Sequence, residues 1–180
     1  MARKKQEGNR FFRMDADFFS DRKIKILKAR YGADGIVLYL YLLCEIYKTG
    51  YYLQVDDDFE YIITDSEFEN MDGNKVKQVL NFLLERSLFD DTLFQSDKVL
   101  TSAGIQRRYQ AMVKARATKT PITAERFWLL SEEETETFIK VNPSLNNSEN
   151  NPDNSRKNDD NSRKNDIKGK EKKGEYIYTA

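Results

Sequence analysis

The sequence contains no histidine, and its single cysteine is Cys44. The lack of histidine removes the usual general base and the commonest metal ligand of proteins. There is also no glycine-rich phosphate loop and no pair of spaced cysteines, the patterns that mark nucleotide-hydrolysing sites and zinc sites. We therefore predict a protein that is not an enzyme and that has no cofactor and no metal ion.

Net charge is also lacking, because 30 lysines and arginines balance 30 aspartates and glutamates. A neutral chain has no overall field that attracts a polyanion, so a nucleic-acid surface would have to be a local patch. The lone Cys44 cannot form an intramolecular disulfide, which fits a reducing cytosol. The charged start of the chain is not followed by an apolar signal core. The sequence therefore predicts a cytoplasmic protein that does not enter a membrane.

Aspartate clusters are the remaining candidates for a cation site. Asp15 and Asp17 form one pair, and Asp56, Asp57 and Asp58 are consecutive. Neither set has the aspartate, asparagine and glycine spacing of a calcium loop. Consecutive aspartates before a helix more often cap it with help from the helix dipole, so capping is the role we predict.

Only one long apolar run is present, from Gly35 to Tyr47. Its apolar residues point in nearly every direction around a helix, and its only charge is Glu45. A run of 13 residues is too short to span a bilayer. It predicts the buried central helix of a small core, with Asp34 as its N-cap and Gly50 at its end.

Composition divides the chain near Val141, where aromatic and aliphatic residues give way to polar and charged ones. Beyond this point the sequence Asn-Ser-Arg-Lys-Asn-Asp occurs twice, which is typical of a disordered low-complexity segment. We predict four parts: a basic arm over residues 1–10, a folded domain over 11–119, a helical extension over 120–141 and a disordered tail over 142–180.

The folded domain alternates helical and β-prone patterns. A first helix is expected to run through Tyr31, with Asp21 or the preceding Ser20 as its N-cap and Gly32 at its end, and the central helix follows. Residues 51–55 are β-branched and aromatic enough to predict a short strand. Another helix is expected after Asp58.

The clearest amphipathic helix covers residues 75–86, with Asp72 as its N-cap. Two β-prone runs follow, at residues 88–94 and 98–101, and they predict a hairpin. A last helix begins at Ser102. This order predicts a mostly helical α+β fold, the winged helix, in which the helix before the hairpin enters a DNA groove and the hairpin touches the flanking backbone.

The extension is expected to form two further short helices. Thr120 or Thr123 can begin one that carries Trp128, and residues 131–134 have the capping-box pattern that opens another. A lone tryptophan next to a domain usually packs on that domain, so we expect Trp128 to do so.

The exposed side of the amphipathic helix carries side chains that suit DNA reading. Lysine pairs with guanine or phosphate, while glutamine and asparagine pair with adenine through two hydrogen bonds. The same residue types also suit any solvated helix face, so both interpretations stand on the residues alone. The predicted recognition residues are Lys75, Lys77, Gln78 and Asn81.

Basic residues elsewhere are candidates for phosphate contacts, which are independent of base sequence and sensitive to salt. A charge run is usually only a solvated surface, so each residue alone is weak support. The candidates in the first helix, the hairpin and the last helix are Arg22, Lys23, Lys25, Lys28, Lys98, Arg107, Arg108, Lys114 and Arg116.

Paired aromatic residues near the N-terminus suggest a further surface. They provide much apolar area for a terminal segment, and this area suits either its own core or a second copy of the chain. The candidates for self-association are Phe11, Phe12, Phe18 and Phe19.

Four separated motifs add a resemblance to these patterns. They read FFRMDADFFSDRKI at 11–24, YGADGI at 31–36, YLYLL at 39–43 and TSAGIQRRY at 101–109. In this order they resemble the N-terminal domain of DnaD-like replication-initiation proteins of phages and prophages of Gram-positive bacteria. The resemblance implies a winged helix that organises a replisome in the host cytoplasm, with DNA, double- or single-stranded, copies of itself and helicase-loading proteins as partners.

Fuller relatives of that kind continue into a C-terminal helical domain, for which this sequence shows no pattern. This predicts a naturally short relative or a truncated one. Two other functions stay open, namely an oligomerisation and partner-docking module that does not read DNA, and a phage transcription regulator with the same fold.

Overall fold

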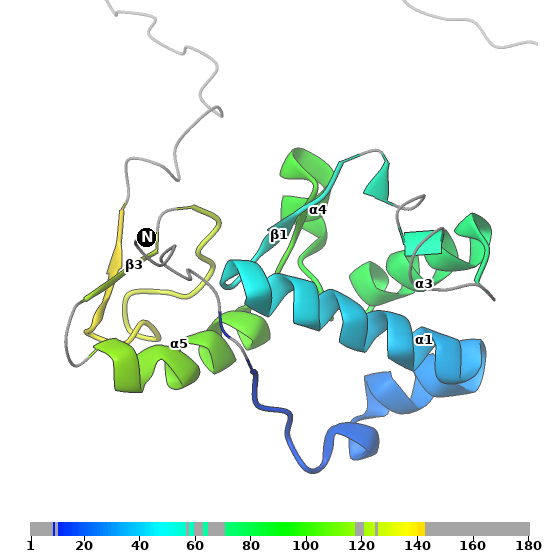
Figure 1. Ribbon diagram of the computed structural model, residues 1–180, viewed down its shortest axis with the longest axis horizontal. Helices are drawn as coiled ribbons and strands as arrows, with labels where there is room; N and C mark the ends of the chain where they lie inside the picture. The colour runs from blue at the N-terminus through cyan, green and yellow to red at the C-terminus, as the bar shows by residue number, and fades with distance from the viewer. Residues whose placement is uncertain are drawn as a thin grey trace, which may run out of the picture. The chain divides into compact units, whose positions relative to one another are not determined.

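The computed structural model describes residues 9, 11–56, 58–59, 63–64, 71–117, 121–124 and 126–142. In this part of the chain helices predominate, and the strands form two small sheets (Figure 1). This confirms a mostly helical α+β architecture. The elements are η1 (Phe18–Ser20), α1 (Arg22–Thr49), β1 (Leu53–Gln54), α3 (Gly73–Glu85), α4 (Asp91–Asp97), β2 (Val99–Leu100), α5 (Ala103–Ala117), β3 (Ile122–Ala124) and β4 (Ile139–Val141).

Helix α1 begins at a side-chain cap and bends at Gly32. The Asp21 carboxylate accepts hydrogen bonds from two backbone N–H groups, including that of Lys23 at 2.7 Å, which confirms the predicted N-cap. Gly32 has φ 68° and ψ −151°, so α1 consists of a first segment, residues 22–31, and a second segment, residues 33–49. The predicted break at this glycine is therefore confirmed.

The corner of α1 needs glycine at two positions. Gly32 has a positive φ, and a Cβ added at Gly35 would lie 2.7 Å from the Cβ of Tyr31. Asp34 is not the N-cap of the second segment, which corrects the prediction, because the residue with non-helical backbone angles is Gly32. The Asp34 carboxylate instead forms an ion pair with Lys75 of α3.

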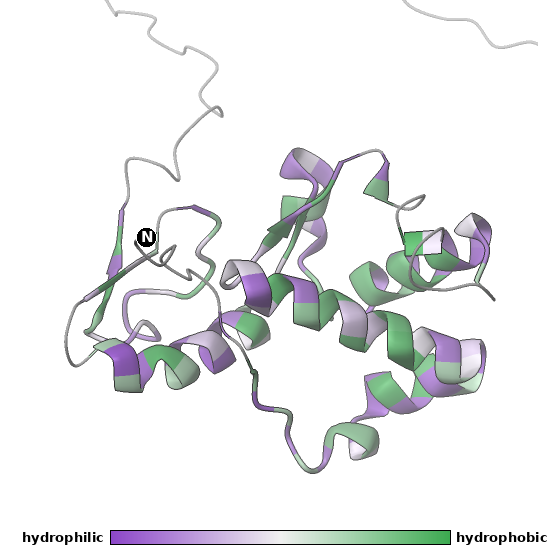
Figure 2. Cartoon of the chain, viewed as in Figure 1, coloured by the Kyte–Doolittle hydropathy of each residue, from purple (hydrophilic) through white to green (hydrophobic). Residues whose placement is uncertain are grey.

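The second segment of α1 is the centre of the core, as predicted. Leu38 and Ile46 are fully buried, and apolar residues follow the segment along most of its length (Figure 2). The Tyr47 hydroxyl donates a hydrogen bond to the backbone carbonyl of Ile105 at 3.3 Å, which ties α1 to α5. Its exposed apolar residue is Val37, at 49%.

Helix α3 is amphipathic, as predicted. The Asp72 carboxylate accepts a hydrogen bond from the backbone N–H of Lys75 at 2.7 Å, which confirms the N-cap. Val76, Val79 and Leu83 are at most 1% exposed. Since these residues recur at helical spacing, one face of α3 packs on the core and the other is left to solvent.

The predicted hairpin between residues 88 and 101 is wrong. Half of this stretch is helix α4, which is capped by Asp90, whose carboxylate accepts a hydrogen bond from the backbone N–H of Leu93 at 2.9 Å. Lys98, with φ 56°, ends the helix in the left-handed conformation. The cap satisfies a first-turn N–H group, which favours a helix over the strand that the apolar pattern suggested.

The strand within residues 51–55 is confirmed. It pairs with a strand that is distant in the sequence. Leu53 of β1 lies opposite Leu100 of β2, and Gln54 lies opposite Val99, in an antiparallel pair. The sheet therefore joins the chain before α3 to the chain after α4.

The extension contains strands where helices were predicted. β3 and β4 pair in parallel, with Ile122 opposite Ile139. The capping-box hydrogen bonds do form, since the Glu134 N–H lies 3.3 Å from the Ser131 hydroxyl and the Ser131 N–H lies 3.4 Å from a Glu134 carboxylate oxygen. Only a turn follows them.

Two buried glutamines of α5 explain this difference. Gln106 is fully buried, and its amide nitrogen donates to the Thr101 hydroxyl at 3.2 Å and to the Phe127 carbonyl at 2.8 Å. Its amide oxygen accepts from the Leu129 N–H at 2.7 Å. Gln110 bonds the backbone nearer β4 in the same manner. Backbone groups between β3 and β4 therefore bond to α5 side chains and not to one another in helical turns.

The extension also contributes to the core. Trp128 is 8% exposed, and Ala124, Leu130 and Ile139 are buried in the same apolar cluster as α1 and α3. The Tyr51 ring lies 5.0 Å from the Trp128 ring, centroid to centroid. Packing of the tryptophan on its own domain is confirmed.

Some predictions lie outside the described residues. These concern residues 1–8 of the basic arm, most of the helix expected after Asp58 and the tail beyond residue 142. Phe59 and residues 63–64 are helical. In the described part of the chain, no helix has the length and apolar character needed to cross a membrane.

The Asp21 cap gives a first prediction. Asp21→Ala removes acceptors of first-turn N–H groups and is expected to lower the free energy of unfolding by about 1 kcal/mol in chemical denaturation. Asp17→Ala is the matched control, because Asp17 precedes η1 without a side-chain cap. Equal losses in the two variants would contradict the capping role.

The buried Gln106 gives a second prediction. Gln106→Leu leaves the Phe127 carbonyl and the Leu129 N–H without their partner, so the free energy of unfolding is expected to fall by about 2 kcal/mol or more. The control is Gln78→Leu, at an exposed position of α3 where only the backbone carbonyl is used. A loss no greater than that of the control would refute the anchoring role.

Candidate nucleic-acid interface

The basic residues of α5 are already occupied by the chain itself. Arg107 binds Glu134 at 2.6 Å, and Arg108 binds Asp15 at 2.6 Å. Lys114 lies 4.0 Å from Glu136, and an Arg116 guanidinium nitrogen donates to the Asn9 amide oxygen at 2.7 Å. These four residues were predicted to contact phosphate, and the structure instead gives each of them an internal partner.

The two arginine pairs have visible electrostatic effects. Burial opposes the charge of Arg108, but the hydrogen bond and the negative charge of Asp15 outweigh it, so the pKa of Arg108 is raised. The hydrogen bond from Arg107 lowers the pKa of the Glu134 carboxyl group. Each shift favours the charged form of its group, the Arg108 guanidinium and the Glu134 carboxylate.

The predicted recognition residues are divided by the structure. Lys75 forms the ion pair with Asp34, whereas Lys77, Gln78 and Asn81 are exposed on α3. These three side chains share the polar face of one helix, as a surface that reads base edges requires.

A small cavity of about 220 Å³ lies beside this polar face. Lys77 and Lys98 both line it, together with Phe94 and Leu80. The Lys98 ammonium group lies 5.2 Å from the centre of the Phe94 ring, a cation–π distance. Lys98 therefore lies near α3, but at the end of α4 and not on a wing.

The first segment of α1 lies along the C-terminal half of α3. The Lys23 ammonium group donates to the Ser87 carbonyl at 3.3 Å, and the Tyr31 hydroxyl donates to the Gln78 carbonyl at 3.2 Å. The rings of Tyr31 and Phe82 meet edge to face at 5.7 Å. Two helices that the sequence predicted separately thus form one surface.

Two arginines of this surface lie over the buried Phe82 ring. The guanidinium carbons of Arg30 and Arg86 lie 5.7 and 5.6 Å from the ring centre, one from each helix. Lys23 lies about two turns before Arg30 on the same flank of α1, since residues seven apart lie nearly above each other on a helix. We call Lys23, Arg30 and Arg86 the basic cluster.

The basic cluster has no acidic partner among the described residues, in contrast to the arginines and Lys114 of α5. Lys25 and Lys28 have none either, but helical geometry of about 100° per residue puts them well over 90° away from Lys23 and Arg30. Arg22 is exposed at the start of α1. Of the predicted phosphate contacts, the fold therefore brings Lys23 to the C-terminal end of α3 and Lys98 to the side of α3 that carries Lys77.

Sequence reasoning missed Arg30 and Arg86. The spacing of seven residues between Lys23 and Arg30 was a usable sign, because it places both on one flank of the first segment. The position of Arg86 directly after α3 carried no such sign. Its role depends on the fold of α1 back onto α3, which a local pattern does not contain.

The N-terminal aromatic residues also divide into two groups. Phe12 stacks on Tyr47 at 5.0 Å, and Phe18 stacks on Tyr39 at 6.2 Å. Phe11 is 79% exposed and Phe19 is 54% exposed. Two of the four candidates for self-association therefore pack on their own domain, and two remain on the surface.

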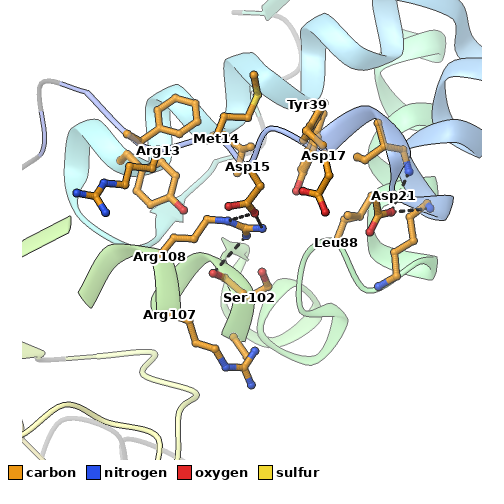
Figure 3. A pocket seen from close by; sticks show the side chains of 18 of the residues that line it. Arg13, Met14, Asp15, Asp17, Asp21, Tyr39, Leu88, Ser102, Arg107 and Arg108 are labelled. Carbon is orange, nitrogen blue, oxygen red and sulfur yellow. Dashed lines mark hydrogen bonds and ion pairs between the residues drawn. The ribbon is translucent and has the colours of Figure 1, made fainter. Parts of the chain in front are cut away.

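A larger cavity, of about 560 Å³, lies between the N-terminal segment and the start of α5 (Figure 3). Asp15 and Arg108 meet in it, and burial raises the pKa of the Tyr39 hydroxyl in its wall to about 12. Charges of both signs line it, so it favours neither an anion nor a cation. The charged lining residues are Arg13, Asp15, Asp17, Asp21, Lys23, Arg107 and Arg108.

Metal ligands do not gather in the described part of the chain. No group of three histidine, cysteine, aspartate or glutamate side chains lies close enough there to hold an ion. Asp21 acts as a cap and Asp15 as an ion-pair partner, which gives both carboxylates a structural use.

The part of the chain that contains the basic cluster is similar to known proteins. Residues 11–105 match the family model described as Lin1244/Lin1753-like, N-terminal. Over 116 residues the chain is 30% identical to the "uncharacterized phage-related protein Lin1244/Lin1753" of Listeria innocua serovar 6a. This match covers 64% of the chain and 37% of the relative, so the chain spans little more than a third of that protein's length. No solved structure gives a significant match.

The matched residues include α1, α3 and the start of α5, and with them the whole basic cluster. They amount to more than half of the chain. The comparison supports a phage association and leaves the DnaD-like resemblance a prediction. By this match, the chain belongs to the Lin1244/Lin1753-like family and contains that family's N-terminal region.

Proposed function

We propose that this chain is a non-catalytic DNA-binding protein of a phage or prophage that acts in replication initiation. The observation that carries the proposal is the basic cluster. Lys23, Arg30 and Arg86 come from two helices, lie beside the exposed face of α3 and have no acidic partner among the described residues. Cations that the fold gathers and leaves uncompensated are suited to phosphate groups.

The chemistry of the cluster fits a nucleic-acid backbone. A guanidinium group can bind two phosphate oxygens at once, and the Phe82 ring holds both arginine side chains in place. The polar face of α3 begins within the same surface, at Gln78 and Asn81. In this arrangement the cluster would hold the phosphates while α3 faces the bases.

The order of elements supports the same docking. Along the chain the elements are the second segment of α1, β1, α3, α4 and β2. This resembles the order of a winged helix, with α4 in the place of the first wing strand. In that fold the helix equivalent to α3 enters the DNA groove. We therefore propose a winged-helix-like module whose phosphate contacts come from α1 and not from a wing.

The biological setting is carried by two weaker arguments. The Listeria relative is described as phage-related, and the four motifs resemble DnaD-like replication-initiation proteins. Replication implies helicase-loading partners and little dependence on base sequence. A transcription regulator would bind one operator far more tightly than random DNA, so competition between specific and random duplexes distinguishes the two roles.

The basic cluster gives a third prediction. In the full chain, Arg30→Gln with Arg86→Gln is expected to weaken binding to random duplex about tenfold and to lower the salt dependence of log Kd by up to about two units, because two phosphate contacts are lost. Fluorescence anisotropy at several salt concentrations measures both, with single-stranded DNA titrated in parallel.

The matched control is Lys25→Gln with Lys28→Gln. It changes the net charge by the same amount, on the flank of the first segment of α1 that faces away from α3. Thermal unfolding of both variants checks that the fold is kept. Equal weakening by the two pairs, or DNA binding that neither pair changes, would contradict the assignment of this surface.

Self-association is a second candidate function, favoured by exposed apolar side chains near the N-terminus. Phe11, Phe19 and Met14 are 79%, 54% and 51% exposed. Exposed aromatic area of this kind is typical of a contact with another protein copy. A platform that assembles through this segment would serve a replisome with or without direct DNA contact.

Light scattering tests this candidate and gives a fourth prediction. If the chain is oligomeric, Phe11→Ser with Phe19→Ser is expected to shift its mass toward the monomer, because the contact loses its two aromatic groups. Val37→Ser removes an exposed apolar side chain from α1 and serves as the control. A mass of the parent chain equal to one copy would refute the candidate.

A further inference from the structure

One stripe of α5 is covered by an acidic turn of the extension. Arg107, Gln110 and Lys114 lie within about 60° of one another around the helix, so they form one row along it. Glu134 and Glu136 lie against the two ends of this row. Glu134 pairs with Arg107 at one end of the row, and Glu136 lies near Lys114 at the other end.

The turn is held at its middle by Gln110. Its amide nitrogen donates to the Glu134 carbonyl at 2.9 Å, and its amide oxygen accepts from the Glu136 N–H at 3.1 Å. On one side of these bonds Arg107 donates to the Glu134 carboxylate at 2.6 and 3.3 Å. On the other side Lys114 faces the Glu136 carboxylate.

The shape of the turn is fixed by its own hydrogen bonds. The Thr135 hydroxyl donates to the Ser131 carbonyl at 2.7 Å and accepts from the Trp128 indole N–H at 2.9 Å. Trp128 is in turn buried against Tyr51. The two glutamates are thus presented to α5 by a turn whose anchor is in the core.

We propose that residues 131–136 are a built-in competitor that covers a second polyanion-binding stripe on α5, formed by Arg107 and Lys114. The class of ligand, nucleic acid, rests on the proposed function. When a phosphate backbone meets α5, its charges can replace the two carboxylates, and the turn then keeps its hydrogen bonds with Gln110 and its anchor at Trp128. The stripe therefore binds a polyanion less readily than the basic cluster does, because the two carboxylates must first be displaced.

The exposure of the ion pairs makes this exchange physically reasonable. The side chains of Arg107 and Glu134 are 55% and 43% exposed, and those of Lys114 and Glu136 are 67% and 45% exposed. Pairs in contact with solvent are weakly held and screened by salt. A polyanion also gains from the release of its counterions, which a single carboxylate does not.

The covered stripe and its turn lie after the residues that the family model matches. The family match ends at residue 105, whereas Arg107, Lys114 and both glutamates come after it. The basic cluster lies inside the match. The covered stripe therefore belongs to the part of the chain beyond the N-terminal family region.

The test compares two pairs of substitutions in the full chain. Glu134→Gln with Glu136→Gln removes the competing charges, while glutamine keeps the capping-box hydrogen bond to Ser131. The control is Glu132→Gln with Glu133→Gln, which changes the charge equally within the same turn at exposed residues without an ion pair. Affinity for random duplex and its salt dependence are measured by fluorescence anisotropy.

The proposal expects the first pair to tighten binding about threefold or more and to steepen the salt dependence by up to about two units, for two added phosphate contacts. The control is expected to change both much less. Arg107→Gln with Lys114→Gln, added to the first pair, is expected to remove the gain. Equal gains in both pairs, no gain, or a gain that survives the loss of Arg107 and Lys114 would each overturn it.

The outcomes separate this proposal from the proposed function. If the parent chain binds DNA through Arg30 and Arg86 and the first pair gains nothing, only the covered stripe is refuted. If the parent chain does not bind and the first pair does, the stripe stands and the basic cluster falls. If none of the chains binds DNA, both proposals fail.

Discussion

The bend of α1 is the constraint on which the rest of the structure depends. Gly32 has φ 68° and ψ −151°, a backbone region that is essentially restricted to glycine and costs other residues about 1–3 kcal/mol, and Gly35 leaves room where a Cβ would meet Tyr31. Because the helix turns here, its second segment can be buried at the centre while its first segment lies along α3. The cations of the first segment are thereby brought to the end of α3, where Phe82 supports Arg30 and Arg86. A straight helix of the same sequence would leave these charges far apart.

The fold also determines which charges remain available to a partner. The net charge is zero, yet the compensation is uneven. On α5 the chain supplies Asp15, Glu134 and Glu136 to its own cations. On the α1 and α3 surface it supplies none to the basic cluster among the described residues. An overall composition that argues against a polyanion partner is therefore compatible with a local surface that attracts one, because attraction at close range depends on the nearest charges.

Structural features that depend on neighbouring residues in the chain were predicted correctly from the sequence. The caps at Asp21 and Asp72, the break at Gly32 and the apolar stripe of α3 were predictable because neighbours in the chain determine them. Apolar runs were ambiguous. Residues 88–101 contain α4 and β2 where a hairpin was predicted, and residues 122–141 contain β3, β4 and a non-helical segment between them that bonds to Gln106. For the candidate surface, residue type selected Lys23 together with four α5 cations that have internal partners, and it did not select Arg30 and Arg86, which the fold places beside Phe82. Whether a surface cation is occupied depends on contacts between distant segments, which no local pattern records.

The replacement of the expected hairpin by α4 changes how a DNA duplex would be held. A wing contacts the backbone beside the recognition helix, and here that place is taken by a short helix whose C-terminal residue, Lys98, lies over Phe94. The uncompensated cations lie instead at the opposite end of α3, on α1 and just after Glu85. Backbone contacts would therefore be strongest at the C-terminal end of α3. Since a helix dipole puts partial negative charge at that end, the arginines there also offset a repulsion that a bare helix terminus would present to phosphate.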